Sequence, residues 1–307
     1  MPVKPSPVEV NHLTKRFGRG GTGVLAVDDL TFTVAPGRIT GFLGPNGAGK
    51  TTTLRCLVGL VRPTSGTATI GGQSYGQLQH ATTVVGAALE ASGFHPARTA
   101  RQILRIRAAA VGLPDDSIDS MLGFVGLADA RDRKAGQFSL GMKQRLALAL
   151  ALLPDPSVLI LDEPANGLDP AGIAWLRQFL RGLADEGRTI LVSSHLLAEV
   201  RQTVDDVVIL DEGRLVAAGP LAQVVGDEVT VVAETPNPEG LTAALTEAGG
   251  TATSVGTRLT IAGLTGAQVG HLAFVAGIEL HELHEEHVEL EQVFLRLTTK
   301  RPTGEQS

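Results

Sequence analysis

Gly44-Pro45-Asn46-Gly47-Ala48-Gly49-Lys50-Thr51 is the most informative segment of this 307-residue chain for predicting its fold class. It fits the pattern G-x-x-x-x-G-K-[ST] and lies between an apolar run, Arg38–Leu43, and a helical pattern, Lys50–Gly59. Glycines let backbone N–H groups turn inward around phosphate oxygens, and the following helix N-terminus adds partial positive charge. A solvated glycine-rich turn is the alternative, which the flanking strand and helix disfavour. This phosphate loop predicts a nucleotide site in which Lys50 reaches the β- and γ-phosphates and Thr51 offers its hydroxyl to Mg²⁺.

A second buried strand ends in two carboxylates. The apolar run Val158–Leu161 is followed at once by Asp162 and Glu163. In P-loop ATPases an acid at this position faces the Mg²⁺ ion, so we expect that role for Asp162. Glu163 is then placed to orient or deprotonate the attacking water. Two solvated acids at a strand end are the alternative, and the phosphate loop upstream makes it the weaker interpretation.

The order of apolar patterns predicts an α/β fold. From Val8 to about Ala218, short β-branched runs alternate with helical patterns, which is typical of a mostly parallel core sheet with crossover helices. Antiparallel strands at 8–13 and 29–34 flank a glycine-rich turn and form a separate β subdomain. A helical subdomain is expected at about 95–140. Further strands are expected at Val158–Leu161 and Thr189–Ser193, with a helix around Trp175–Leu183.

The composition changes near Gly219-Pro220, where a second domain begins. Its expected elements are strand 228–234, helix 239–248, strands 251–255 and 258–262, helix 266–276 and strand 278–283, with a last helix at 288–297. This β-α-β-β-α-β order predicts a small α+β ferredoxin-like domain. The domains are therefore expected at 1–220 and 227–300, with a frayed tail at 301–307.

His281, His284 and His287 recur every third residue among acidic side chains, a spacing that raises the question of a metal site. If Leu280 and Leu283 alternate on a strand, the three imidazoles do not converge on one point. We therefore expect an exposed strand end there.

The overall composition bears on several classes of protein. An apolar share of 43% and a charged share of 19% argue against disorder and against a fibrous repeat. The net charge of −6 gives no support for nucleic-acid binding. The single cysteine, Cys56, cannot form an internal disulfide, which favours a reducing compartment. The longest apolar run, Leu146–Leu153, is too short to cross a membrane, so any membrane role is expected to come from a partner.

Phe138-Ser139-Leu140-Gly141-Met142-Lys143-Gln144-Arg145 resembles the signature motif of the ABC ATPases, whose usual form is Leu-Ser-Gly-Gly-Gln. Ser139, Gly141, Gln144 and Arg145 agree with that motif, whereas Phe138, Leu140 and Met142 depart from it. The resemblance covers nearly all of residues 8–218. Ala165–Asp169 is similar to the D-loop, His195 to the switch histidine and Phe17 to the aromatic residue that stacks on adenine. Glu90 stands where most of the family has the Q-loop glutamine, as in the bacitracin and lantibiotic export ATPases, and a carboxylate can still accept from a metal-bound water.

The resemblance implies an ATP-hydrolysing cassette with ATP and Mg²⁺ as cofactors. It implies a head-to-tail homodimer or heterodimer at the cytoplasmic face of the membrane, which energises a separate integral-membrane permease. Export of a drug or antibiotic-like substrate is expected, with no nucleic-acid partner. Residues 90–98, with Phe94 as an exposed anchor, are expected to meet the permease, and the alternative is that Phe94 packs inward against the helical subdomain. A soluble ABC ATPase acting as a regulatory or repair clamp stays open as the alternative, although its coiled-coil insertion or basic groove is not seen in the sequence.

The residues expected at the site fall into three groups. The catalytic group is Glu163, His195 and Glu90, and the metal group is Thr51, Asp162 and, through water, Glu90. The group expected to bind nucleotide is Phe17, Gly44, Pro45, Asn46, Gly47, Ala48, Gly49, Lys50, Thr51, Thr52, Ser139, Gly141 and Asp169.

Overall fold

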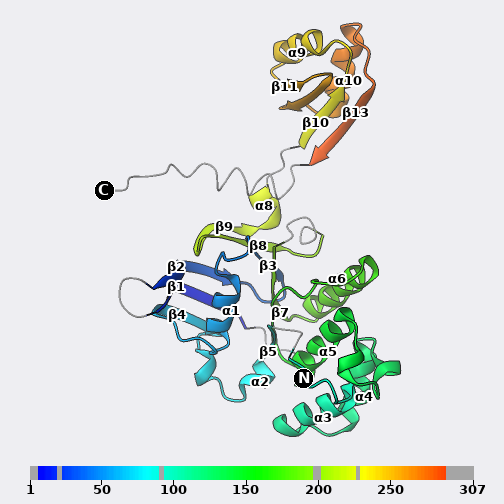
Figure 1. Cartoon of the computed structure of the whole chain (residues 1–307). Helices are drawn as coiled ribbons and strands as arrows, with labels where there is room; N and C mark the ends of the chain where they lie inside the picture. Colours follow the sequence, from blue (N-terminus) through cyan, green and yellow to red (C-terminus); the bar gives the residue numbers. More distant parts are fainter. Residues whose placement is uncertain (1–5, 19–22, 90–92, 196–201, 226–228, 288–307) are drawn as a thin grey trace. The chain divides into compact units, whose positions relative to one another are not determined.

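The computed structural model describes residues 6–18, 23–89, 93–195, 202–225 and 229–287. The chain forms two compact units, Met1–Leu221 and Ala222–Ser307 (Figure 1). A short helix, α8 (Leu221–Val225), spans the boundary between them. Each unit has its own cluster of buried apolar side chains, so each is described separately.

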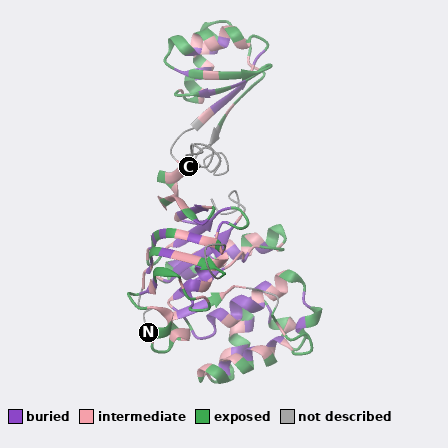
Figure 2. Cartoon of the chain, turned by 60° about the vertical axis from the view of Figure 1, so that its left-hand side comes forward, coloured by how far each residue is buried: buried purple, intermediate pink, exposed green. Residues whose placement is uncertain are grey.

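The first unit is built on a six-stranded sheet with the order β5-β6-β7-β3-β8-β9. Five neighbouring strands pair in parallel, and β9 is antiparallel to β8. The bounds are β3 (Ile39–Leu43), β5 (Val85–Ala88), β6 (Val158–Leu161), β7 (Thr189–Ser194), β8 (Asp206–Asp211) and β9 (Arg214–Pro220). Every residue of β3, β6 and β7 is buried, as expected of parallel strands covered on both faces (Figure 2).

Because these strands are parallel, their carboxyl ends meet at one edge of the sheet, where ligands bind in open α/β folds. The phosphate loop follows β3 and leads into α1 (Lys50–Leu57). Asp162 and Glu163 follow β6, and His195 follows β7. The register Leu161↔Val192 and Phe42↔Ser193 aligns these three strand ends.

An antiparallel sheet with the order β2-β1-β4 packs against the same core. Its strands are β1 (Val8–Phe17), β2 (Val24–Val34) and β4 (Ser65–Ile70), and a Phe32–Phe42 ring contact at 5.2 Å joins it to the core sheet. The strands expected at 8–13 and 29–34 were therefore too short. Register shifts after Val10 and Leu13 break the alternation of apolar residues. His12 and Asp29 have positive φ at these irregular positions, so the alternation of buried and exposed residues is interrupted there.

The helical part of the first unit contains α3 (Ala100–Val111), α4 (Asp116–Phe124) and α5 (Leu140–Leu152). Thr99 begins α3 with a reciprocal capping box to Gln102, which satisfies two backbone donors at the helix start. Phe94 is half-buried and packs against the apolar cluster of these helices. The expectation that Phe94 is an exposed anchor was wrong. The described residues of this unit also form α2 (Ala81–Val84), α6 (Pro170–Asp185) and single turns at Tyr75–Gln77, Ala128–Ala130 and Ala135–Gln137.

The second unit contains β10 (Val229–Glu234), α9 (Pro238–Glu247), β11 (Thr251–Val255), β12 (Arg258–Ala262), α10 (Gly266–Val275) and β13 (Glu282–His287). Its strands pair antiparallel in the order β11-β12-β10-β13. The apolar cluster of this unit combines residues of α9 and α10 with alternate residues of β10 and β12. This is the β-α-β-β-α-β order of ferredoxin-like folds.

The last described strand differs from the one expected at 278–283. It begins at Glu282, because Ile278 and Leu280 pack against the apolar cluster of the unit instead of joining the ladder. In the backbone ladder of this strand, His284 pairs with Val232 and His287 pairs with Val229 of β10. The helix expected at 288–297 and the tail at 301–307 lie outside the described residues.

The single cysteine and the absence of a long apolar helix can both be checked in the described part of the structure. Cys56 is buried in α1, and burial raises the pKa of its thiol, so the cysteine acts as a packing residue. In the part of the chain that the structure describes, no helix is both long enough and apolar enough to cross a bilayer.

Thr40 gives a stability test of the core sheet. It is buried, and its hydroxyl has no hydrogen-bond partner among the described residues. Thr40→Val keeps the shape and removes the desolvated hydroxyl, so we expect the free energy of unfolding to rise by about 1 kcal/mol. The matched control is Thr189→Val, because the Thr189 hydroxyl donates to the Ser6 carbonyl at 2.8 Å. Thr189→Val should lower stability by about 1 kcal/mol.

Urea unfolding followed by fluorescence measures both changes, because the single tryptophan of the sequence, Trp175, belongs to the first unit. A loss of stability in Thr40→Val as large as that in Thr189→Val would contradict the assignment.

Candidate functional site

The phosphate loop depends on close backbone contacts that only glycine permits. Gly44 has φ 152° and Gly49 has φ 97°. A Cβ at Gly44 would lie 2.4 Å from the Leu210 carbonyl oxygen, and one at Gly49 would lie 2.4 Å from that of Ala26. Both positions therefore exclude a side chain on steric grounds, and both favour the left-handed half of backbone space. The loop shape is fixed by its neighbours β8 and β2.

Lys50 is held inside this loop. Its side chain is only 6% exposed, and Nζ donates to the carbonyl oxygens of Gly44 at 2.6 Å and Pro45 at 3.2 Å. Glu163 Oε1 lies 3.6 Å from the same ammonium group. A buried charge needs such partners, since burial without them is costly. Lys50 therefore presents a fixed positive charge at the start of α1.

Asp162 is held through both carboxylate oxygens. The Thr51 hydroxyl donates to Oδ2 at 2.7 Å, and the Ser193 hydroxyl donates to Oδ1. The Asp162 backbone N–H donates to the Ala88 carbonyl at 2.9 Å, which extends the pairing of β6 with β5 by one step. The carboxylate thus has a fixed orientation beside the phosphate loop.

Glu163 has an unusual backbone conformation. Its φ is 48°, which is uncommon for a residue with a side chain. Its N–H donates to Ser193 Oγ at 2.9 Å, and Oε2 lies 2.8 Å from His195 Nδ1. The Gln144 side-chain amide, from the signature-like segment, reaches the Glu163 carbonyl at 3.4 Å. The Glu163 carboxylate therefore lies between the ammonium group of Lys50 and the imidazole of His195.

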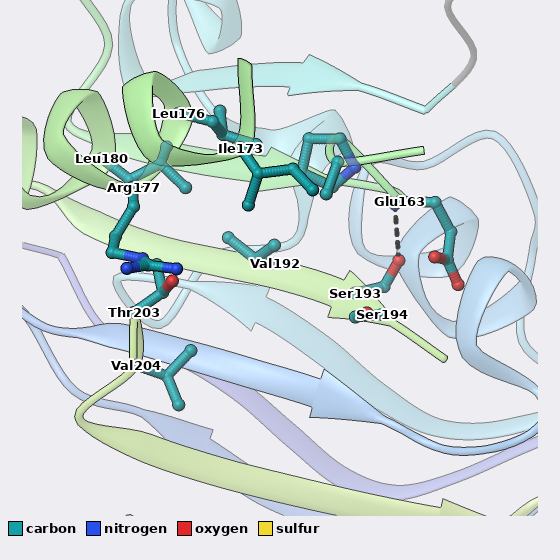
Figure 3. A pocket seen from close by; sticks show the side chains of 12 residues that line it. Glu163, Ile173, Leu176, Arg177, Leu180, Val192, Ser193, Ser194, Thr203 and Val204 are labelled. Atoms are coloured by element: carbon teal, nitrogen blue, oxygen red, sulfur yellow. Dashed lines mark hydrogen bonds between the residues drawn. The ribbon is translucent and has the colours of Figure 1, made fainter. Parts of the chain in front are cut away.

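A hollow opens at the phosphate loop and brings together much of the expected site. It is lined by Ala26, Pro45, Asn46, Gly47, Gly49, Lys50, Thr51, Thr52 and Glu163. On the other side of Glu163 lies an apolar pocket, in which Ile173, Leu176 and Val192 face one another (Figure 3). The carboxylate of Glu163 points away from those apolar side chains (Figure 3).

Ser139 and Asp169 serve as helix caps. Ser139 Oγ accepts from the Met142 N–H at 3.2 Å at the start of α5, and Asp169 Oδ1 accepts from the Gly172 N–H at 2.8 Å at the start of α6. Both residues line a second hollow, together with Leu140, Gly141, Met142, Arg145, Gly167, Leu168 and Gly172. This hollow shares no lining residue with the one at the phosphate loop. The two hollows are therefore separate within one copy of the chain.

Arg145 connects the signature-like segment with two neighbouring helices. Its guanidinium lies 3.7 Å from the Trp175 ring centroid and donates to the Val125 carbonyl at 3.0 Å. Burial lowers the pKa of Arg145, while Asp169 acts in the opposite direction. Arg145 thus links α5 with α6 and with the end of α4, and it has a structural role.

Phe17 lies at the end of β1 with 44% of its surface exposed, and Lys15 Nζ is 4.8 Å from its ring centroid. It does not line the hollow at the phosphate loop. Glu90, expected in the Q-loop, lies outside the described residues.

Sequence patterns alone gave no role to Ser193, although it contacts both acids. Its polar side chain at the carboxyl end of a buried strand was the available signal. Ala26, which lines the phosphate-loop hollow from β2, had no signal in the sequence.

Comparisons with known proteins agree with this geometry. The model of the ABC transporter family matches residues 27–166, and that of a domain of unknown function, DUF8746, matches residues 229–291. The bacitracin transport ATP-binding protein BcrA of Bacillus licheniformis is 45% identical over 216 residues, which are 69% of either chain. The Nod factor export ATP-binding protein I of Burkholderia lata is 38% identical over 234 residues, 75% of either chain.

Solved structures show the same fold. The ATP-binding subunit of an ABC transporter gives a TM-score of 0.62 at 31% identity, covering 71% of this chain and 91% of that one. The dimeric cassette MJ0796 gives a TM-score of 0.64 at 22% identity, covering 70% and 98%, and supports the fold alone. The resemblance to the bacitracin export ATPases is confirmed. Sequence identity, fold and the phosphate loop thus agree that this chain belongs to the ATP-binding, ATP-hydrolysing proteins of the ABC transporter family.

Proposed function

We propose that this ATPase powers the export of a drug or antibiotic-like substrate through a separate integral-membrane permease, from the cytoplasmic face of the membrane. The observation that carries the hydrolytic part is the Glu163 carboxylate, 3.6 Å from Lys50 and 2.8 Å from His195 beside the phosphate loop. Support for export comes from relatives named for bacitracin transport and Nod factor export.

In this proposal the phosphate loop binds the triphosphate of ATP. Backbone N–H groups at the start of α1 point toward phosphate oxygens, where the helix dipole also favours negative charge. The Lys50 ammonium group would give up its contact with the Gly44 carbonyl oxygen and bind the β- and γ-phosphates instead. Phe17 contributes an exposed ring on which the adenine stacks. Each of these contacts holds the nucleotide with its γ-phosphate toward Glu163.

The residues beside the loop fit Mg²⁺. The Thr51 hydroxyl and the Asp162 carboxylate lie 2.7 Å apart, and hard oxygen donors of this kind suit that ion. Thr51 and Asp162 would hold the ion, with Glu90 acting through a water. The bound ion would neutralise charge on the phosphates.

Glu163 is the proposed general base. Its carboxylate accepts a proton from the attacking water or orients that water toward the γ-phosphate. His195, at 2.8 Å from Glu163 Oε2, holds the carboxylate and can also contact the γ-phosphate.

A complete site requires two copies. The hollow at Ser139, Gly141 and Asp169 is separate from the phosphate-loop hollow, so each ATP would lie between the loop of one copy and the signature-like segment of the other. Helix N-termini, such as that of α5 capped by Ser139, favour phosphate groups. A homodimer or a heterodimer with a related ATPase satisfies this geometry.

The permease contact is proposed near residues 90–98. Phe94 packs inward, so the exposed residues Pro96 to Arg98 are better placed for that contact. Beside them, Arg98, Gln102, Arg105, Ile106 and Ala109 line a shallow groove. Exchanging Gln102 and Arg105 for glutamate should weaken binding to the permease while hydrolysis by the isolated ATPase stays unchanged.

Export itself is tested by purifying the chain from its native membrane with the permease that it binds. Reconstituted inside-out vesicles should take up a peptide antibiotic only with ATP. Uptake that is equally fast with a Glu163→Gln subunit, or no integral-membrane protein in the purified complex, would contradict the transport proposal.

Glu163→Gln should preserve ATP binding and nearly abolish turnover, because the phosphate contacts stay and the base is lost. The ATP-bound variant should accumulate as a dimer, detectable by size-exclusion chromatography with light scattering. Hydrolysis at the wild-type rate would show that another group activates the water.

Lys50→Ala should weaken nucleotide binding itself, since it removes a point charge from the triphosphate site. Isothermal titration with ATP and with adenosine separates the two contributions, because adenosine carries no phosphate. An unchanged affinity for ATP would exclude the proposed contact.

Phe17→Ala should weaken ATP and ADP equally, by about 1–3 kcal/mol, the range of base stacking on aromatic rings. Phe17→Trp is the matched control, because it keeps an aromatic face. If Phe17→Ala binds both nucleotides as tightly as the wild type, the base is held elsewhere.

A further inference from the structure

We propose that Ser193 is a positioning residue that sets the geometry of Asp162 and Glu163 together. Its hydroxyl donates to Asp162 Oδ1. The same oxygen accepts from the Glu163 N–H at 2.9 Å (Figure 3). The residue is fully buried at the carboxyl end of β7. The proposal rests on the proposed role of Glu163 as the base.

The polarity of these two hydrogen bonds is fixed. A serine hydroxyl has one proton, and an ionised carboxylate can only accept. The Ser193 proton therefore goes to Asp162, and a lone pair on the same oxygen accepts the backbone proton of Glu163. One oxygen atom thus connects the carboxylate expected on the Mg²⁺ side with the backbone that carries the base.

Strand pairing explains why this hydroxyl is needed. The ladder between β6 and β7 ends at Leu161↔Val192, one residue before Asp162 and Ser193. β7 continues to pair with β3 through Phe42↔Ser193, so Ser193 itself stays fixed. The Ser193 side chain replaces the missing ladder bonds at the point where the chain leaves β6.

The backbone of Glu163 needs this support. A φ of 48° is an uncommon conformation for glutamate and persists when surrounding contacts hold it. The Ser193 hydroxyl is the hydrogen-bond acceptor of the Glu163 N–H. Without that acceptor the part-buried N–H loses its partner, and the backbone can relax toward ordinary φ values. The carboxylate would then leave its position between Lys50 and His195.

Ser193→Ala tests this role. We expect kcat to fall about 10- to 100-fold, the range found when a supporting hydrogen bond is removed or a reacting group moves by about 1 Å. The affinity for ATP in the absence of Mg²⁺ should change little, because the phosphate loop is untouched. Ser193→Thr keeps the hydroxyl and should recover most of the rate.

Thr189→Val is the matched control, because Thr189 is a buried, hydrogen-bonded hydroxyl on the same strand. It should lower stability without lowering kcat. If Ser193→Ala and Thr189→Val lose activity in proportion to their loss of stability, Ser193 has a general structural role and the proposal fails.

Two further measurements do not depend on that comparison. In the nucleotide-free chain, Ser193→Ala should speed hydrogen exchange at the Glu163 amide, and unchanged exchange would overturn the proposal. In the Glu163→Gln background, Ser193→Ala should cost far less than in the wild type, because the base it positions is already lost. A full, additive loss in the double variant would show that Ser193 acts on another step.

These outcomes separate the inference from the proposed function. If Glu163→Gln hydrolyses ATP normally while Ser193→Ala still speeds exchange at Glu163, the base assignment fails and the positioning of the backbone stands. If Glu163→Gln is inactive and Ser193→Ala has wild-type kcat, the base assignment stands and the role of Ser193 fails.

Discussion

Parallel pairing of β6, β7 and β3 is the constraint on which the site depends. These strands are buried on both faces, so their backbone groups must pair within the sheet and their register is strongly specified. The pairing Leu161↔Val192 and Phe42↔Ser193 brings the ends of three distant segments to one edge. A shift of register by one residue would separate Asp162 from Ser193 and remove the shared hydrogen bonds.

At this edge of the sheet, the buried charge of Lys50 and the strained backbone of Glu163 are each stabilised by neighbouring groups. The ammonium of Lys50 has two carbonyl partners and a nearby carboxylate, and the positive φ of Glu163 is held by the Ser193 hydroxyl. A strained residue at a candidate catalytic position agrees with the general tendency of strain to gather at functional sites. The surrounding sheet supplies the rigidity, since the site lies directly on strand ends.

Much of the fold could be predicted because its signals are local. The phosphate loop, the apolar strands β3 and β6 and the helices that follow them each have a pattern within one segment. The strands β1 and β2 were underestimated, because bulges near His12 and Asp29 interrupt the alternation. The last strand was placed too early, because Ile278 and Leu280 are buried without strand pairing. A periodic apolar pattern indicates which residues are buried, but a buried residue need not belong to a hydrogen-bonded strand.

The family and most of the residues that line the phosphate-loop hollow could be predicted from residue types at fixed spacing, because such spacing specifies a turn, a helix start and a pair of acids. Tertiary structure alone decided that Phe94 packs inward, that Asp169 caps α6 and that Ser193 joins Asp162 to Glu163. The physical reason is that Ser193 and Asp162 are 31 residues apart and meet only through the register of two strands. A period-two apolar pattern says which face a residue occupies and leaves open which residue of the next strand lies beside it.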